Sequence, residues 1–200
     1  MKAIIFDLGN VLINYDHLGM LTAVGQLTNT PDQPLDAPPD LIEQFVTGKI
    51  NGRSFHQTLV NRAILNADYD AFVAAFNSTM GRNETAIAYA ISLLNKPALK
   101  VGIISNTNPI HVAWLRKHVP ELARFHALIL SNDVGLEKPD AAIYQLALAQ
   151  LGVQPQQALF IDDFAPNIAG AKAVGIHAVQ HQEWEVTKTA VETFIFPEAA

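Results

Sequence analysis

Six residues that can do chemistry stand at or shortly after the ends of short apolar runs in the sequence. In chain order they are Asp7, Ser105, Asn106, Lys138, Asp162 and Asp163. A carboxylate can attack an electrophile or bind a cation, while a hydroxyl and backbone N–H groups bind an anion and a lysine neutralises negative charge. Together they provide a nucleophile, a cation site and an anion site, which is the set that phosphoryl transfer requires.

The adjacent carboxylates Asp162 and Asp163 are the main argument for a metal ion. They directly follow Ala-Leu-Phe-Ile, where two buried negative charges are costly unless a cation neutralises them. An exposed acidic turn is the alternative, and the four preceding apolar residues disfavour it. A site of hard oxygen ligands, with no His or Cys, suits Mg²⁺.

The other residues also have ordinary structural explanations when each is taken alone. Asp7 can start a turn, Ser105 can cap a helix, and Lys138 before a proline can be a solvated charge at a helix start. A cation at a helix N-terminus opposes the helix dipole, however, so the position of Lys138 favours an anionic partner. The conjunction of these residues, rather than any one of them, indicates phosphoryl transfer through an acyl phosphate.

The elements that must position these residues are alternating strands and helices. Runs typical of buried strands are Ala3–Phe6, Val101–Ile104, Ala127–Leu130, Ala158–Ile161 and Ile176–Val179. Periodic segments such as Ala141–Leu151 lie between them and predict helices. We therefore expect an α/β protein with a parallel sheet, helices on both faces, and a functional site at the edge where the strands end.

The stretch from residue 16 to residue 82 breaks this alternation. It contains no convincing strand, and pairs such as Leu41/Phe45 and Phe72/Phe76 have the i, i+4 spacing of helices. A proline cluster precedes the first of these pairs, at Pro31, Pro34, Pro38 and Pro39. We expect a core of residues 1–15 and 83–200, with residues 16–82 inserted after the first strand as a small all-helical cap.

Composition excludes several classes of protein. The 200 residues include 13 Lys and Arg against 19 Asp and Glu, a net charge of -6 that disfavours sequence-independent nucleic-acid binding. The absence of cysteine excludes disulfides, thiolate metal sites and a cysteine nucleophile. The apolar start reaches Asp7 too soon for a secretory signal of about 7–15 apolar residues or a membrane span of about 20. We therefore expect a cytoplasmic protein with no nucleic-acid or membrane partner.

The motifs resemble those of the haloacid dehalogenase superfamily and occur in that family's order. They are Phe6-Asp7-Leu8-Gly9-Asn10-Val11, Ser105-Asn106-Thr107, Lys138-Pro139, and Asp162-Asp163 with Asn167. The helical insertion is similar to the family's C1-type cap, so the resemblance implies a Rossmann-like core carrying such a cap. More narrowly, the DLGNV opening, Ser-Asn-Thr-Asn and Gly48-Lys49-Ile50 resemble the bacterial alpha-glucose-1-phosphate phosphatase branch.

The resemblance implies a catalytic role and a Mg²⁺ site for the acidic residues. Asp7 would attack phosphorus and also bind Mg²⁺, with the backbone carbonyl of Gly9 and the carboxylate of Asp163 as the other protein ligands. Asp162 would act on the metal through water, and Asn167 follows the pair at the interval usual in the family.

The resemblance also implies a phosphate cradle and exposes one departure from the family pattern. Ser105, the backbone N–H of Asn106 and Lys138 would hold the phosphoryl oxygens, and Lys138 would assist catalysis. The family's phosphatases usually carry a second Asp two residues after the nucleophile as general acid and base, and this chain has Gly9 there. Nucleophile, metal site and cradle are all retained, whereas the usual proton donor is absent.

The function expected from these residues is hydrolysis of small phosphorylated metabolites by a Mg²⁺-dependent phosphatase. Sugar phosphates such as a sugar 1-phosphate are the expected substrates. The alternatives are a haloacid dehalogenase, which would work without a metal, and a catalytically impaired protein that binds a phosphorylated ligand. Polar residues of the insertion that could face the site are Asp16, His17, Arg53 and His56.

Overall fold

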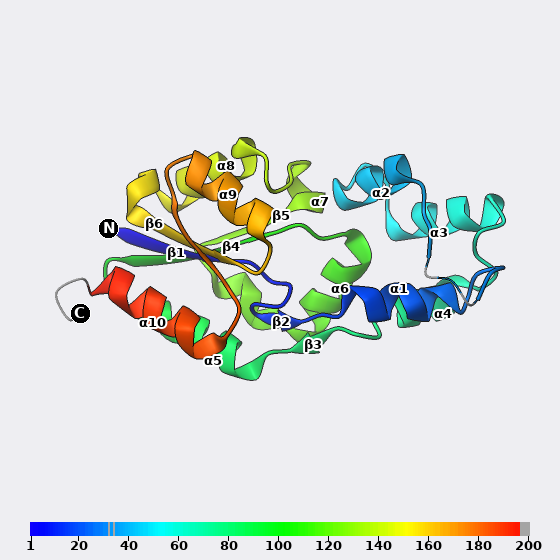
Figure 1. The fold of residues 1–200 in the computed structure, drawn as a ribbon, viewed down its shortest axis with the longest axis horizontal. Coiled ribbons are helices and arrows are strands. Elements are labelled where there is room, and N and C mark those ends of the chain that lie inside the picture. Colours follow the sequence, from blue (N-terminus) through cyan, green and yellow to red (C-terminus); the bar gives the residue numbers. More distant parts are fainter. Residues whose placement is uncertain (32, 34, 197–200) are drawn as a thin grey trace.

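The computed structural model describes residues 1–31, 33 and 35–196. Its centre is a five-stranded parallel sheet in the order β5-β4-β1-β6-β7 (Figure 1). The strands are β1 (Lys2–Phe6), β4 (Leu99–Ser105), β5 (Ala127–Leu130), β6 (Ala158–Asp162) and β7 (His177–Gln180). Each begins within two residues of a run identified in the sequence, so the expected α/β fold with a parallel sheet is confirmed.

Helices cover both faces of this sheet because its strands alternate apolar residues between two cores. Ile4 and Phe6 of β1 pack with α5 (Glu84–Leu93), α6 (Pro109–His118) and α10 (Trp184–Ile195). Ala3 and Ile5 point to the opposite core, with α8 (Ala141–Leu151) and α9 (Ala165–Ala173). Short elements complete this part of the chain: η1 (Pro120–Arg124), α7 (Ser131–Val134) and η2 (Pro155–Gln157). No helix in the described ranges is long and apolar enough to cross a membrane.

The insertion forms a separate helical layer beyond one end of the sheet (Figure 1). Its helices are α1 (His17–Gly25), α2 (Pro39–Val46), α3 (Gly52–Asn61) and α4 (Tyr69–Phe76). They enclose an apolar cluster of their own, in which Phe45 stacks on Phe55 at a centroid distance of 4.1 Å. We call α1 to α4 the cap helices. Pro39 begins α2 and Pro38 precedes it, whereas Pro34 lies outside the described residues.

Two short strands connect the cap helices to the sheet. β2 (Ile13–Asn14) and β3 (Gly81–Arg82) pair antiparallel, one before α1 and one after α4. We expected no strand between residues 16 and 82, and β3 falls at the end of that range. A two-residue strand carries too little periodicity to be recognised in the sequence, because its formation depends on the pairing of Ile13 with Arg82 and of Asn14 with Gly81 across the whole insertion.

The cap helices also touch the core at a second place, between α2 and α7. Ser131, the first residue of α7, donates a hydrogen bond from Oγ to the carbonyl oxygen of Val46 at 2.8 Å. Gly48 follows α2 with a φ of 72°, and a side chain there would collide with the backbone of Asn132. Glycine is therefore required at this close approach. The cap helices thus stand over the edge where β1, β4 and β6 end.

Candidate active site

Asp7 follows β1 directly and is held at the centre of this edge. Its backbone N–H donates to the carbonyl oxygen of Ile161 at 2.8 Å, which fixes the end of β1 against β6. The side chain is buried, and burial raises the pKa of the Asp7 carboxyl to about 6, although the nearby Lys138 ammonium opposes the shift. The Lys138 ammonium thus favours the ionised form, which a carboxylate nucleophile requires.

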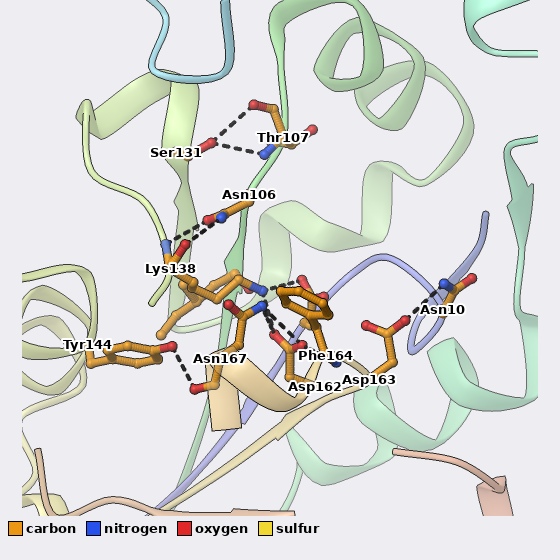
Figure 2. A network of polar contacts seen from close by, with 12 residues as sticks. Asn10, Asn106, Thr107, Ser131, Lys138, Tyr144, Asp162, Asp163, Phe164 and Asn167 are labelled. Carbon is orange, nitrogen blue, oxygen red and sulfur yellow. Dashed lines mark hydrogen bonds and ion pairs between the residues drawn. The ribbon is translucent and has the colours of Figure 1, made fainter. Parts of the chain in front are cut away.

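Lys138 joins two carboxylates at the ends of different strands, Asp7 directly after β1 and Asp162 at the end of β6. Figure 2 shows Lys138 beside Asp162. Its Nζ lies 2.8 Å from Asp7 Oδ1 and 2.6 Å from Asp162 Oδ2, and its side chain is only 1% exposed. Burial alone would lower the pKa of Lys138, but the two carboxylates outweigh it and the pKa is raised. Lys138 is thus a permanently charged cation beside Asp7, and the anionic partners expected from its position in the sequence are these two aspartates.

Asn106 holds the backbone of Lys138 in place. Its Nδ2 donates to the carbonyl oxygen of Lys138, and its Oδ1 accepts from the N–H of Lys138, both at 2.8 Å (Figure 2). Asn106 follows the end of β4, so these two bonds tie the loop before α8 to the sheet edge. This side-chain function adds to the backbone N–H contact that the family resemblance implies for Asn106.

Asp162, at the end of β6, is completely buried and its acceptor positions are taken (Figure 2). Oδ1 accepts from the N–H of Phe164 at 2.8 Å, and the Asn167 amide donates to both oxygens, at 3.1 and 3.0 Å. Oδ2 also accepts the short bond from Lys138. The carbonyl oxygen of Asn167 in turn accepts from Tyr144 Oη at 2.8 Å. This network indicates that Asp162 positions Lys138 and the start of α9.

Asp163 has a different environment from its neighbour, because its side chain is only half-buried. Its Oδ2 accepts from Asn10 Nδ2 at 2.9 Å, and its carbonyl oxygen accepts from Gln180 Nε2. Asn10 has a φ of 55° in the turn after Gly9. Its amide therefore ties the turn after β1 to the turn after β6, across 153 positions of sequence.

The three aspartates form a cluster that fits Mg²⁺. Asp7, Asp162 and Asp163 each place a carboxylate oxygen so that the three lie within 4.8 Å of one another. Among the described side chains, Asp7 Oδ1 is one of the few buried oxygens without an aligned hydrogen bond, despite its ion pair with Lys138. Clustered carboxylate oxygens are the hard ligands that Mg²⁺ takes in proteins, and Asp163 is the member of the cluster that is only half-buried.

Ser105, Asn106 and Gly9 line one small cavity of about 50 Å³ at the same edge. Ser105 is the last residue of β4 and is buried. At Gly9 a Cβ would meet no atom within 4 Å, so the missing side chain at this position leaves open space. The structure thus brings the nucleophile candidate, the lysine, the acidic pair and the expected phosphate cradle to one place.

Ser131 was missed in the sequence, although a signal for it was present. It directly follows Ala127–Leu130, and the residue after each apolar run is where functional groups were expected. The structure buries it completely, with Oγ accepting from the N–H of Thr107 at 2.9 Å (Figure 2). Ser131 therefore holds the loop after β4 and touches α2 as well. Asn10 had no comparable signal, because its amide bonds Asp163, which lies in the turn after β6 and far away in the sequence.

Of the four polar residues that could face the site from the insertion, His17 lines a cavity there and the others have structural partners. Asp16 caps α1 by accepting from the N–H of Gly19. Arg53 lies over the ring of Tyr69, and the His56 ring bonds the carbonyl oxygen of Ala67 within the cap helices. His17 Nδ1 lies 3.1 Å from Tyr15 Oη, and His17 lines a cavity of about 400 Å³ between the cap helices and the sheet edge.

A family model described as haloacid dehalogenase-like hydrolase matches residues 1–175 of the chain. Curated relatives of similar length include the D-ribitol-5-phosphate phosphatase of Bacteroides thetaiotaomicron, 24% identical over 96% of this chain and 98% of its own. The sesquiterpene phosphatase astK of Aspergillus oryzae is 27% identical over 88% and 87%. The chain spans only 19% of the mouse acyl-CoA dehydrogenase family member 10, with 25% identity.

The fold is also similar to solved structures. The HAD family enzyme bt-2542 of Bacteroides thetaiotaomicron, in complex with magnesium and inorganic phosphate, superposes with a TM-score of 0.80. The superposition covers 94% of this chain and 98% of that one, at 24% sequence identity. That similarity extends over the sheet and the cap helices together.

Proposed function

This chain belongs to the haloacid dehalogenase-like hydrolases, and on that premise we propose that it is a Mg²⁺-dependent phosphatase of small phosphorylated metabolites. The observation that carries the proposal is the buried chain of contacts from Asp7 through Lys138 to Asp162, with Asp163 beside it. It places a nucleophile, a fixed cation and a carboxylate cluster within one sheet edge. We further propose residues 1–15 and 83–200 as the core domain and residues 16–82 as its cap.

In the proposed reaction the Asp7 carboxylate attacks the phosphorus of the substrate. The bond from phosphorus to the ester oxygen breaks, and the leaving oxygen takes a proton from water. Water then attacks the aspartyl phosphate, which releases inorganic phosphate and restores the carboxylate. Lys138, held by Asp162 and Asn106, neutralises charge on the phosphoryl oxygens, while Ser105 and the backbone N–H of Asn106 donate hydrogen bonds to them.

Three protein groups would hold the metal: the carboxylates of Asp7 and Asp163 and the backbone carbonyl of Gly9. A bound Mg²⁺ offsets the repulsion between the anionic nucleophile and the anionic substrate. Asp162 is occupied by Lys138, Asn167 and the N–H of Phe164, which supports an indirect role for it. The half-buried position of Asp163 leaves it free to turn toward an ion.

The leaving group is restricted because Gly9 provides no proton. Esters whose leaving oxygen is weakly basic need a general acid least, and these include sugar 1-phosphates, aryl phosphates and acyl phosphates. Among sugars, a 1-phosphate such as that hydrolysed by the alpha-glucose-1-phosphate phosphatase branch is therefore the proposed substrate. The sugar of a 6-phosphate would leave as a strongly basic alkoxide, so sugar 6-phosphates are disfavoured as substrates.

Phosphate release from acetyl phosphate and glucose 1-phosphate, with Mg²⁺ and with EDTA, tests the proposal. We expect turnover only with Mg²⁺, and a borohydride-trapped acyl phosphate on the peptide that contains Asp7. Ligand binding without turnover of any monoester would identify an impaired binding protein instead. Metal-independent release of halide from a 2-haloacid would identify a dehalogenase.

A further inference from the structure

A cavity of about 400 Å³ lies between the cap helices and the sheet edge. Volumes of 300–1,000 Å³ are usual for small-ligand pockets. Its walls are predominantly apolar, with side chains from all four cap helices as well as from the loop before α2. They include Met20, Leu21, Leu35, Ile42, Phe45 and Phe76.

This cavity adjoins the small cavity at Gly9 and Ser105. Tyr15, Asn106, Thr107 and His111 line both the large cavity and the small one that contains Gly9 and Ser105. A phosphomonoester held by Ser105 and Asn106 would therefore extend its organic part beneath the cap helices. The walls of the large cavity consequently select the leaving group.

Three polar side chains on the floor of the cavity, Asn106, Asn108 and His111, already bond one another or the backbone. Asn106 bonds the backbone of Lys138 through both side-chain atoms. Asn108 Oδ1 accepts from the N–H groups of Ile110 and His111, and its amide lies 3.1 Å from His111 Nδ1. A sugar ring placed against these three side chains would bring hydroxyl groups to neighbours that are occupied, and buried hydroxyls without partners are costly.

His111 adds no positive charge to this floor. Its Nε2 bonds the carbonyl oxygen of Phe76 at 3.3 Å, and burial lowers its pKa to about 4. Glu137 is the charged side chain among the described residues of the wall, and no Lys or Arg joins it there. A second anionic group on the substrate would therefore find no counterion beyond the catalytic site.

We propose that the substrate is an aryl phosphomonoester whose aromatic leaving group fills this apolar cavity. This inference rests on the proposed phosphatase function and selects aryl phosphates, in place of sugar 1-phosphates, among the esters whose leaving oxygen is weakly basic. Two independent features agree on an aromatic group. The apolar walls, with phenylalanine side chains from α2, α3 and α4, fit an aromatic ring. The oxygen of an aryl leaving group is weakly basic, so it can depart without the general acid that is missing at Gly9.

The test compares kcat/KM for 1-naphthyl phosphate, glucose 1-phosphate and acetyl phosphate in the parent and two variants of the cavity wall. Leu21 and Ile42 line the cavity, Leu21 partly buried at the margin of the apolar cluster of the cap helices and Ile42 43% exposed, so Leu21→Asn and Ile42→Asn spare the fully buried residues of that cluster. Leu18→Asn is the matched control, because Leu18 lies on α1 like Leu21 but is 65% exposed and outside the cavity wall. Acetyl phosphate provides the reference rate, since its methyl group is too small to fill the cavity.

We expect the parent to prefer 1-naphthyl phosphate over glucose 1-phosphate by at least about tenfold. Each wall variant should lower the ratio of kcat/KM for 1-naphthyl phosphate to that for acetyl phosphate by about tenfold. Leu18→Asn should leave that ratio unchanged. A parent that prefers glucose 1-phosphate, or wall variants with the control's ratio, would overturn the inference while the phosphatase function stands.

Calorimetric binding of 1-naphthyl phosphate separates the two proposals if no ester is turned over. Failure to hydrolyse even acetyl phosphate would refute the phosphatase function. Tighter binding of 1-naphthyl phosphate than of glucose 1-phosphate, weakened in Leu21→Asn, would still support an aromatic ligand in the cavity. Equal binding of the two esters would refute that ligand class as well.

Discussion

Gly9→Asp should accelerate the hydrolysis of alkyl phosphates selectively, because it restores a carboxyl group two residues after Asp7. The structure permits the substitution. A Cβ at Gly9 would have no neighbour within 4 Å, and Gly9 is not among the residues with a positive φ. The new side chain would enter the space beside Ser105 and Asn106, where the leaving oxygen of a bound ester would lie.

The size of the effect follows from how well this carboxyl is held. General acid catalysis contributes about 10²–10⁴-fold when the acid is well positioned, which corresponds to about 3–5 kcal/mol in the barrier. The open space around Gly9 leaves the new side chain without packing contacts, so much of the gain from orientation is lost. We therefore expect an increase of about 10- to 100-fold in kcat/KM for glucose 6-phosphate. For 1-naphthyl phosphate or acetyl phosphate, whose leaving oxygens need no acid, we expect little change.

The assay measures kcat/KM for these three esters in the parent, in Gly9→Asp and in Gly9→Asn. The amide is the matched control, since it has the size of the carboxyl group but cannot donate a proton to the leaving oxygen as an acid. Acceleration of glucose 6-phosphate by Gly9→Asn, or equal acceleration of all three esters by Gly9→Asp, would refute the leaving-group reasoning. A parent that already favours glucose 6-phosphate would refute it too.

Three further predictions concern other residues of the site. Asp7→Asn should abolish phosphate release while circular dichroism stays at the parent spectrum, because an amide cannot attack phosphorus; activity at the parent rate would show that another residue is the nucleophile. Asp163→Ala should raise the Mg²⁺ concentration for half-maximal activity more than Asp162→Ala does. Asp162→Ala should instead lower the free energy of unfolding by about 3 kcal/mol, because it removes a buried partner of Lys138. The reverse order of the two variants in a Mg²⁺ titration would exchange the roles of the two aspartates. The folded-state pKa of His111 is lowered to about 4 from 6.5, so the unfolded chain binds the proton more tightly. The free energy of unfolding should therefore fall by about 3 kcal/mol as the pH drops from 6.5 to 4. Urea denaturation at these pH values should show a shallower fall in His111→Gln, and equal slopes would exclude His111 as the cause.

The arrangement of the sheet and the position of its functional edge could be predicted from the sequence. Short apolar runs separated by helical periodicity admit few arrangements, and parallel strands bring their carboxyl ends to one edge. Asp7, Ser105 and Asp162 each lie at the end of such a run, so local pattern was enough to bring them together. The helical insertion was visible for the same reason, because its i, i+4 pairs are local.

The pairing of side chains across that edge was decided by tertiary structure. Nothing local in the sequence indicates that Lys138 bridges Asp7 and Asp162, or that Asn10 bonds Asp163 across 153 positions. Such contacts depend on the register of β1 against β6 and on the path of the loop before α8. The different burial of the adjacent Asp162 and Asp163 has the same origin, because the strand end turns one carboxylate inward and the other toward the surface.

The apolar cavity likewise could not be predicted from the sequence. Leu21, Ile42 and Phe45 are recognisable as apolar positions on helices, and such positions predict burial against neighbouring helices. Whether those side chains fill the space between the cap helices and the sheet, or leave part of it open, depends on how the helices are placed over the sheet edge. Residue type and spacing therefore determine the layers and which polar residues stand at the strand ends, while the shape of the space between the layers is set only when the layers pack.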